Sequence, residues 1–439
     1  MKTSIIIPVW NGSAHLPACL DSLLKLNMPS TALEIIAVDN ASSDGSADLI
    51  ADRYPQVRLL RNARNEGFAG GCNRGLEVAT GEYLILLNQD TAVTPSWLDG
   101  LQTALTDPAV GVAGCKILYP DSQTIQHAGG WLEWPLALAR HHGHGELDRG
   151  QWDVSRDVEF VTGAGLATRR DVLERIGLLD EGFWPGYFED VDFCLRAREA
   201  GYRVRYVAEA VMMHQESTSL TDPAEMAEAY QKGRLRLLLK HTPPDRFLES
   251  FIPAEEAYQP DVIASRTHLP LLTAYQAALL TAPAILAERW QANAAQIQAV
   301  QAALLILQNR VGSLELEYMD RRLAQLGTEH GKEADAVGLP PFHFSSAVPI
   351  LGPFIRSFRW LWYNMAARWP VEHLRSRQEQ INREQARLNR EYAELLRHQA
   401  GLIRMIQHQL ALLTQQACRQ GETAETDVHQ AQTQYRQDE

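Results

Sequence analysis

The segment Glu34–Ser46, with the sequence EIIAVDNASSDGS, sets the pattern for the first half of the chain. Its first part, Glu34–Asp39, is apolar on both faces, which is typical of a buried strand in a parallel sheet. The strand ends in the carboxylate of Asp39, and polar turn residues then lead into a helix. Asp39 could accept hydrogen bonds from a base or a ribose and Asp44 could cap the helix, but an ordinary strand–turn–helix explains the segment equally well.

The same alternation of buried strand and helix continues over about 220 residues. Further strands are predicted at Ser4–Val9, Val57–Leu60, Tyr83–Asn88, Val110–Ala113 and Val204–Met213, and helices at Ala14–Leu26, Gly45–Arg53, Ala69–Ala79, Trp97–Thr106 and Val191–Ala200. This rhythm predicts an α/β fold, a Rossmann-like and mostly parallel sheet flanked by helices. Ligands of such sheets bind at the carboxyl ends of the strands.

Composition narrows the class of protein. The 439 residues fit two or three domains, and the net charge of -13 argues against a nucleic-acid partner. The cysteines are far apart and form no CxxC pair, which favours a reducing compartment. We find neither a signal peptide nor a run of about 18 apolar residues, so a cytoplasmic protein is expected.

Three regions follow one another along the chain. We predict a catalytic α/β domain over residues 1–245, a long-helix region over 246–338, and a region from 339 to 439 that holds an amphipathic segment, a heptad helix and a disordered tail. Helix is expected from about Thr273 to Leu326, and leucines or isoleucines recur every seven residues between Leu374 and Leu402. This coiled-coil-like seam predicts either a homo-oligomer or a helix folded back on its neighbour.

The segment 349–369 mixes aromatic residues with Arg356, Arg359 and Arg368 and has no acid. Such a helix can lie in a membrane interface with its arginines on anionic headgroups. A buried helix with arginines that reach to solvent explains it as well. The first interpretation predicts a protein held at the inner face of the cell membrane.

Four further elements carry chemistry. Arg64–Gly75 is glycine-rich but has neither a P-loop lysine nor the GxGxxG spacing, so close packing is its simplest explanation. Asn88 and Asp90 end a buried strand and offer oxygen ligands that suit Mg²⁺ or Mn²⁺ bound to a diphosphate. His214 ends the strand Val204–Met213, where an imidazole would be an ordinary metal ligand or a satisfied core residue.

The segment Gly177–Phe193 is the most specific of these elements. Glu189, Asp190 and Asp192 lie within four positions, and Trp184 precedes them. Asp190 or Glu189 could deprotonate a hydroxyl nucleophile, although acids are also common in the first turn of a helix. Trp184 could stack on a sugar or belong to the core.

Together and in this order, these elements resemble the family-2 inverting glycosyltransferases with a GT-A fold, particularly bacterial rhamnosyl- and galactofuranosyltransferase-like members. The resemblance covers about residues 3 to 220. It implies a nucleotide diphosphate sugar as donor, dTDP-rhamnose or a UDP-sugar, and a glycan or lipid-linked acceptor in cell-surface polysaccharide synthesis. It also implies a divalent cation, Mg²⁺ or Mn²⁺, as cofactor.

The resemblance assigns roles to individual positions. Asp190 would be the catalytic base, and Asp90 with His214 would bind the metal. Gly163 in a TGA-type segment, Trp184 and Glu189 would lie on the acceptor side. The nucleotide sugar would contact Pro8, Asn11, Asp39, Asn65, Asn73, Asn88 and Asp90, with Phe68 in the loop beside it.

One position departs from the family pattern. Asn88 stands where the first aspartate of the DxD motif is expected, so that His214 or Asp192 would have to compensate. Two rival functions were weighed. A sugar nucleotidyltransferase would carry a basic loop after the first strand, but Val9–Ser13 has no Lys or Arg. A non-catalytic carbohydrate-binding or scaffolding protein would not need three intact acids.

Overall fold

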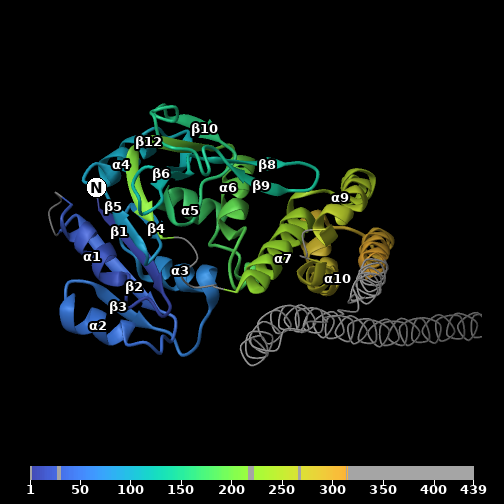
Figure 1. The fold of residues 1–439 in the computed structure, drawn as a ribbon, viewed down its shortest axis with the longest axis horizontal. Helices are drawn as coiled ribbons and strands as arrows, with labels where there is room; N and C mark the ends of the chain where they lie inside the picture. Colours follow the sequence, from blue (N-terminus) through green and yellow to red (C-terminus); the bar gives the residue numbers. More distant parts are fainter. Residues whose placement is uncertain (1, 27–30, 216–221, 265–267, 313, 315–439) are drawn as a thin grey trace, which may run out of the picture. The chain divides into compact units, whose positions relative to one another are not determined.

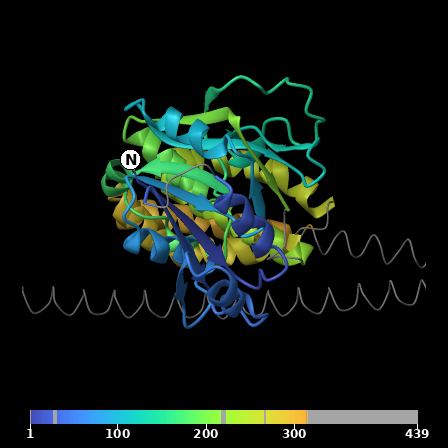
Figure 2. The same ribbon diagram turned by 90° about the vertical axis from the view of Figure 1, so that its left-hand side faces the viewer.

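The computed structural model describes residues 2–26, 31–215, 222–264, 268–312 and 314. The described residues up to Val311 form one compact unit, and they are the coloured part of the chain up to that residue in Figures 1 and 2. The predicted heptad helix and the segment 349–369 lie outside the described residues.

A ten-stranded mixed sheet forms the centre of this unit (Figure 1). Its parallel half has the order β3-β2-β1-β4 and consists of β1 (Thr3–Val9), β2 (Leu33–Asp39), β3 (Arg58–Arg61) and β4 (Tyr83–Leu87). Three of these strands are apolar on both faces because both faces are covered. Because the four strands are parallel, their carboxyl ends meet at one edge of the sheet, as predicted.

The other half of the sheet contains antiparallel pairs. The strand β11 (Gly165–Arg169) runs antiparallel between β4 and β6 (Val110–Leu118), and β12 (Arg203–His214) lies parallel to β6. Three short strands extend these pairs: β5 (Thr91–Val93) and β10 (Arg156–Val158) on β12, and β7 (Ile125–His127) on β6. A separate hairpin is formed by β8 (Gly130–Glu133) and β9 (Leu138–His141).

Helices cover both faces of the sheet. On one face a large apolar cluster combines alternate strand residues such as Ile5 and Ile85 with Leu20 and Trp97. On the other face Gly75 lies so close to Ile6 that a Cβ would approach its side chain to 2.4 Å. The helices are α1 (Leu16–Leu24), α2 (Ser46–Arg53), α3 (Gly67–Val78), α4 (Trp97–Leu105), α5 (Arg170–Ile176) and α6 (Glu189–Glu199). The α/β fold class is therefore confirmed, with ends of the predicted helices shifted by a few residues.

The described chain continues as helices. They are α7 (Pro223–His241), α8 (Pro244–Arg246), a π-helical turn (Phe247–Phe251), α9 (Ile252–Ala264) and α10 (His268–Trp290), followed by a helical stretch over 294–312. The continuous helix predicted from Thr273 is wrong, because residues 291–293 interrupt it and Gln291 has a φ of 51°. By length and composition α10 could cross a membrane, but 56% of its apolar window is buried inside the unit, as in a core helix.

A fully buried ion pair fixes α7 to α9. The guanidinium of Arg234 donates to both oxygens of Glu255 at 2.8 and 2.6 Å, and a third bond reaches the carbonyl of Leu136, in the turn between β8 and β9. Tyr275 of α10 donates to the same carboxylate at 2.7 Å. The helices thus share a polar core with the β8–β9 hairpin, while the domain boundary predicted at residue 245 stays a prediction.

Candidate active site

The ends of β1 and β4 are joined by a side chain. Gln89, directly after β4, accepts from the backbone N–H of Trp10 and donates to its carbonyl, both at 3.0 Å. A Cβ on Gly12 would overlap the Gln89 side chain, so this position requires a glycine. The loops that follow the two strands are therefore held side by side.

The loop after β2 joins the same edge. Asn11 accepts from the backbone N–H of Ser43 at 2.8 Å, and Asp44 accepts from the backbone N–H of Ser13 at 2.9 Å. Burial alone would raise the pKa of Asp44, but its hydrogen bonds from Ser46 and Ser13 outweigh this and lower the pKa to about 2. Asp44 thus does more than cap α2, because it also ties the first two strand loops together. Asp39 lies beneath them, buried, with its carboxylate near the backbone N–H of Ser42.

The glycine-rich start of α3 packs against these loops. A Cβ on Gly71 would come within 2.8 Å of Asn40 and 3.0 Å of Pro8, so close packing explains this glycine. Asn65 accepts from the backbone N–H of Gly67 at 2.9 Å. Asn73 bonds both the N–H and the carbonyl of Leu179 at 3.0 and 2.9 Å, which fixes the segment before the acids. The nucleotide-binding roles predicted for Asn65 and Asn73 stay predictions.

Asp90 and His214 lie together. The Nε2 atom of His214 is 3.3 Å from a carboxylate oxygen of Asp90 and 3.1 Å from Nδ2 of Asn88. The Nδ1 atom is 2.7 Å from Oε1 of Gln126 and donates there, so in a neutral ring the lone pair lies on Nε2. The Nε2 atom of His214 and a carboxylate oxygen of Asp90 therefore face the same space.

These side chains fit a divalent cation. Metal-binding histidines commonly donate their second ring N–H to an oxygen, as His214 does to Gln126. Ligand atoms bound at about 2.1 Å and at right angles to each other are about 3 Å apart, close to the 3.3 Å between His214 and Asp90. A rotation of the Asn88 side-chain amide by about 180° exchanges its nitrogen and its oxygen, so either atom can face this site. Within the described ranges no group of three or more His, Cys, Asp or Glu side chains is arranged for a metal.

Asp190 lies in the first turn of α6. Its Oδ2 accepts from the backbone N–H of Gly163 at 2.8 Å, and its Oδ1 accepts from that of Val191 at 2.8 Å. Burial raises the pKa of Asp190, and these hydrogen bonds oppose the rise. Burial and the neighbouring Asp190 together raise the pKa of Glu189 well above its usual range. Like charges this close disfavour ionisation of both carboxyls, and the two backbone N–H donors favour the charge on Asp190.

The two ends of the site meet at residues 162–164. Gly163 donates to Asp190, and the carbonyl of the next residue, Ala164, accepts from the backbone N–H of Asn88 at 3.1 Å. Asp90 follows Asn88 by two positions, so residues 90 and 190 are brought to one edge of the sheet. Trp184, 58% exposed, lies against Gly67 at the start of α3.

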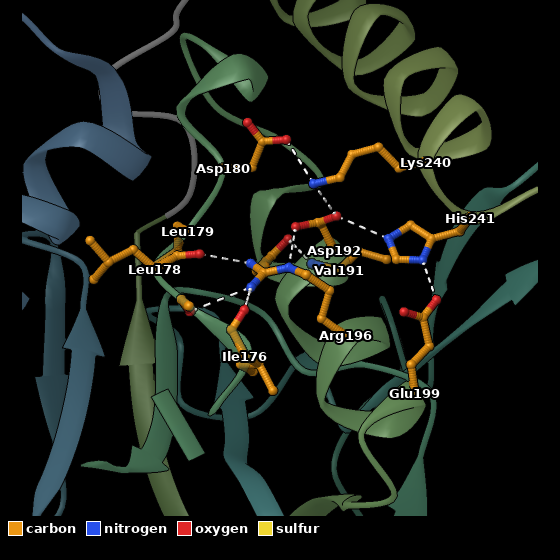
Figure 3. Close-up of polar contacts among 12 residues, drawn as sticks. Ile176, Leu178, Leu179, Asp180, Val191, Asp192, Arg196, Glu199, Lys240 and His241 are labelled. Atoms are coloured by element: carbon orange, nitrogen blue, oxygen red, sulfur yellow. Dashed lines mark hydrogen bonds and ion pairs between the residues drawn. The ribbon is translucent and has the colours of Figure 1, made fainter. Parts of the chain in front are cut away.

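Asp192 faces the opposite way. Two positions along a helix correspond to a turn of about 200°, so Asp192 and Asp190 point to different sides of α6. Asp192 is fully buried and contacts Arg196 at 2.9 Å, Lys240 at 2.7 Å and His241 at 2.9 Å (Figure 3). These cations hold its pKa far below the usual value against the effect of burial. The prediction that Asp192 could compensate for Asn88 at the metal is wrong.

Two partners of Asp192, Lys240 and His241, come from α7 and form a wider network that the sequence did not predict. Lys240 also contacts Asp180 at 2.7 Å, and His241 contacts Glu199 at 2.9 Å (Figure 3). Arg196 donates to the carbonyls of Ile176 and Leu178, which fixes the loop before the acids. The sequence analysis did not single out Lys240 or His241, although basic residues shortly before the prolines at 243 and 244 are typical of a helix ending.

Comparisons with known proteins agree with this geometry. The profile described as "Glycosyl transferase family 2" matches residues 4–177. The O-antigen biosynthesis protein RfbC of Myxococcus xanthus is 33% identical over 50% of this chain and 18% of its own length. An N-acetylglucosaminyl-diphospho-decaprenol L-rhamnosyltransferase of Mycobacterium tuberculosis is 28% identical over 52% of this chain and 81% of its own length.

The solved structures that align with this chain share less of its sequence than these relatives do. A mannosyltransferase from Pyrobaculum calidifontis, solved in complex with GDP-Man and Mn²⁺, aligns with 71% of this chain and 86% of its own at 20% identity and a TM-score of 0.41. The chain spans only 24% of the first curated relative, a protein of Sinorhizobium fredii, and 18% of RfbC. The family model covers β1 to α5, and residues 4–177 of this chain match glycosyl transferase family 2.

Proposed function

We propose that this protein is an inverting glycosyltransferase that moves a sugar from a nucleotide diphosphate sugar to a hydroxyl of a glycan or lipid-linked acceptor. One observation carries the proposal. Oδ2 of Asp190 accepts from the backbone N–H of Gly163, and the carbonyl of the adjacent Ala164 accepts from the N–H of Asn88, two positions before the Asp90 that contacts His214. A base and a diphosphate-binding group at one sheet edge are what a single displacement needs.

The reaction follows from this placement. The acceptor hydroxyl attacks the anomeric carbon from the face opposite the diphosphate, its proton passes to Asp190, and the bond from the anomeric carbon to the diphosphate oxygen breaks. A Mg²⁺ or Mn²⁺ ion held by Asp90 and His214 would neutralise negative charge on the departing diphosphate. Each Asp190 oxygen already accepts one backbone hydrogen bond and keeps a further lone pair for the proton. One displacement inverts the anomeric centre.

Glu189 would support this base. Its Oε2 atom is buried without a hydrogen-bond partner among the described residues, which suits a protonated carboxyl beside an ionised Asp190. With Glu189 neutral, the single charge of the pair resides on Asp190. The same neutral carboxyl, with Gly163 and Trp184, would face the acceptor.

We further propose dTDP-rhamnose or a UDP-sugar as donor and cell-surface polysaccharide synthesis as the pathway. The names of the rhamnosyltransferase and O-antigen relatives support both. Pro8, Asn11, Asp39, Asn65, Asn73 and Asn88 would surround the donor nucleotide. Placement in the cytoplasm at the inner face of the membrane through 349–369, and self-association through the C-terminal helices, belong to the same proposal.

The test begins with donor binding. The full chain with Mn²⁺ is screened against nucleotide sugars by thermal shift, because a ligand that binds only the folded state raises the melting temperature. Selective stabilisation by one donor, lost in Asp90→Asn, is expected. No stabilisation by any nucleotide sugar would contradict the proposal.

Turnover is then measured as release of the nucleoside diphosphate. Asp190→Asn should keep the donor-induced shift and lose release, whereas Asp99→Asn, an exposed acid on α4, should keep both. A product that retains the anomeric configuration of the donor would exclude the single displacement.

A further inference from the structure

A cavity of about 400 Å³ lies at the beginning of β12, and we call it the β12-start cavity. Trp131 of β8, His142 and Arg198 of α6 are among its lining residues, and Arg203 is the first residue of β12. His214 is the last residue of the same strand. At about 3.3 Å per residue the cavity is thus separated from the proposed reaction centre by most of the strand's length.

An aromatic stack forms one wall of the cavity. The rings of Trp131 and His142 have centroids 4.4 Å apart and planes inclined by 32°, and Trp152 continues the stack at 5.0 Å and 34°. Arg156 closes it from behind, 4.5 Å from the Trp152 ring. The stack fixes Trp131 in place while 36% of that residue remains exposed. A rigid, partly open indole at a cavity is a binding platform for an apolar face.

The rim of the cavity is charged but balanced. Arg203 contacts Asp157 at 3.3 Å, and Arg198 lies 3.6 Å from Glu159. Each guanidinium is thus paired with a carboxylate, so the rim has no net positive field for a phosphate group. It offers instead several hydrogen-bond donors and acceptors beside an aromatic face.

A flat apolar face combined with a ring of hydroxyls is the chemistry of a pyranose. We infer that the β12-start cavity binds a sugar unit of a neutral glycan, with its C–H face on Trp131 and its hydroxyls on the arginine–carboxylate pairs. This binding goes beyond the proposed transfer reaction, because it involves none of the residues assigned to that reaction. It would hold a glycan at a point distant from the hydroxyl that reacts.

The experiment measures binding to the full chain by saturation-transfer NMR and calorimetry. The probes are linear oligosaccharides of glucose, mannose or rhamnose, with inorganic phosphate and UDP as charged probes. At least one neutral oligosaccharide should bind with a Kd of about 1 mM, and Trp131→Ala should weaken it about tenfold or more. Trp134→Ala is the matched control, because Trp134 follows on the same hairpin, is 44% exposed and does not line the cavity.

A second variant distinguishes a loss of oligosaccharide binding from a loss of folding. Arg198→Ala removes an exposed rim side chain and should also weaken oligosaccharide binding, while the melting temperature stays near that of the wild type. Absence of oligosaccharide binding at about 20 mM would overturn the inference, as would equal loss in Trp131→Ala and Trp134→Ala. Phosphate or UDP binding that depends on Arg198 would overturn it in favour of a charged ligand.

The outcome is separable from that of the proposed function. Oligosaccharide binding should persist in Asp190→Asn. In the wild type, failed transfer with intact oligosaccharide binding would refute only the transferase. Intact transfer with no binding at Trp131 would refute only the cavity.

Discussion

The two sides of the first turn of α6 place acids in opposite environments. On one side Glu189 is buried with the partly buried Asp190 beside it, and no ion pair among the described residues includes either of them. On the other side Asp192 is buried against Arg196, Lys240 and His241. The pKa is raised for the first two acids and lowered for the third.

The difference shows how one short motif can combine reactivity with stability. Cations gathered around Asp192 anchor the helix, while Asp190 is left without a cation that would make it a weaker base. The anchor also comes from a distant element, α7, so the position of the base depends on residues 50 positions further along the chain.

The sharpest contrast should come from Asp190→Asn. Removing a general base is expected to lower transfer about 10³-fold, close to 4 kcal/mol of barrier. The pKa of Asp190 is raised in the folded state, so its charge disfavours folding above its unfolded pKa, and the variant should melt no lower than the wild type. The transfer rate and the melting temperature, both measured at pH 7, test the two parts of this prediction. Wild-type transfer in this variant would remove the distinction between the two sides of α6.

Asp192→Asn should give the reverse pattern. Three cations lose their shared partner in a buried site, so the free energy of unfolding should fall by about 3 kcal/mol. Denaturant unfolding measures this. Adding Lys240→Met should recover part of the loss, because one buried charge is then no longer left unpaired. A variant as stable as the wild type would show that Asp192 is not the anchor.

His241→Gln should produce a smaller, pH-dependent loss. Burial alone would lower the pKa of His241, but Asp192 and Glu199 raise it overall. The stability that the protonated ring adds is therefore complete below its unfolded pKa and is lost as pH rises through the folded value. The variant should lose about 1 to 2 kcal/mol at pH 5.5 and clearly less at pH 9. An equal loss at both pH values would contradict this account.

Glu189→Gln should change stability least and in the opposite direction. The raised pKa of Glu189 means that its carboxyl disfavours the folded state once pH exceeds the unfolded value. An amide removes this cost, and a gain of about 1 kcal/mol at pH 8, smaller at pH 4, is expected. Thermal melts at the two pH values measure it. Destabilisation at pH 8 would mean that the carboxylate is stabilised in the fold.

The local pattern of apolar residues in the sequence was sufficient to predict much of the fold. Runs such as Ser4–Val9 and Tyr83–Asn88 are apolar on both faces, and burial on both faces is what such runs require. Strand-end positions of Asp39 and Asp90 followed from the same runs. Their convergence could be predicted because parallel strands share one carboxyl edge.

Contacts between distant segments could not be predicted in this way. The strand β11 runs antiparallel between β4 and β6, although nothing in Gly165–Arg169 specifies its direction. The role of Asp192 depends on Lys240 and His241, and the anchoring by Asn73 depends on Leu179, 106 positions away. A single sequence holds no information on which of three neighbouring acids will meet a cation.

The fully buried ion pair between Arg234 and Glu255 limits where this chain can be truncated. A version cut at residue 245 would keep the arginine and lose the glutamate, together with Tyr275. An unneutralised guanidinium in an apolar interior costs about 3 to 5 kcal/mol, a large part of the stability of an ordinary domain. For this chain the smallest piece suited to crystallisation or enzymology therefore extends through α10, well past the last strand.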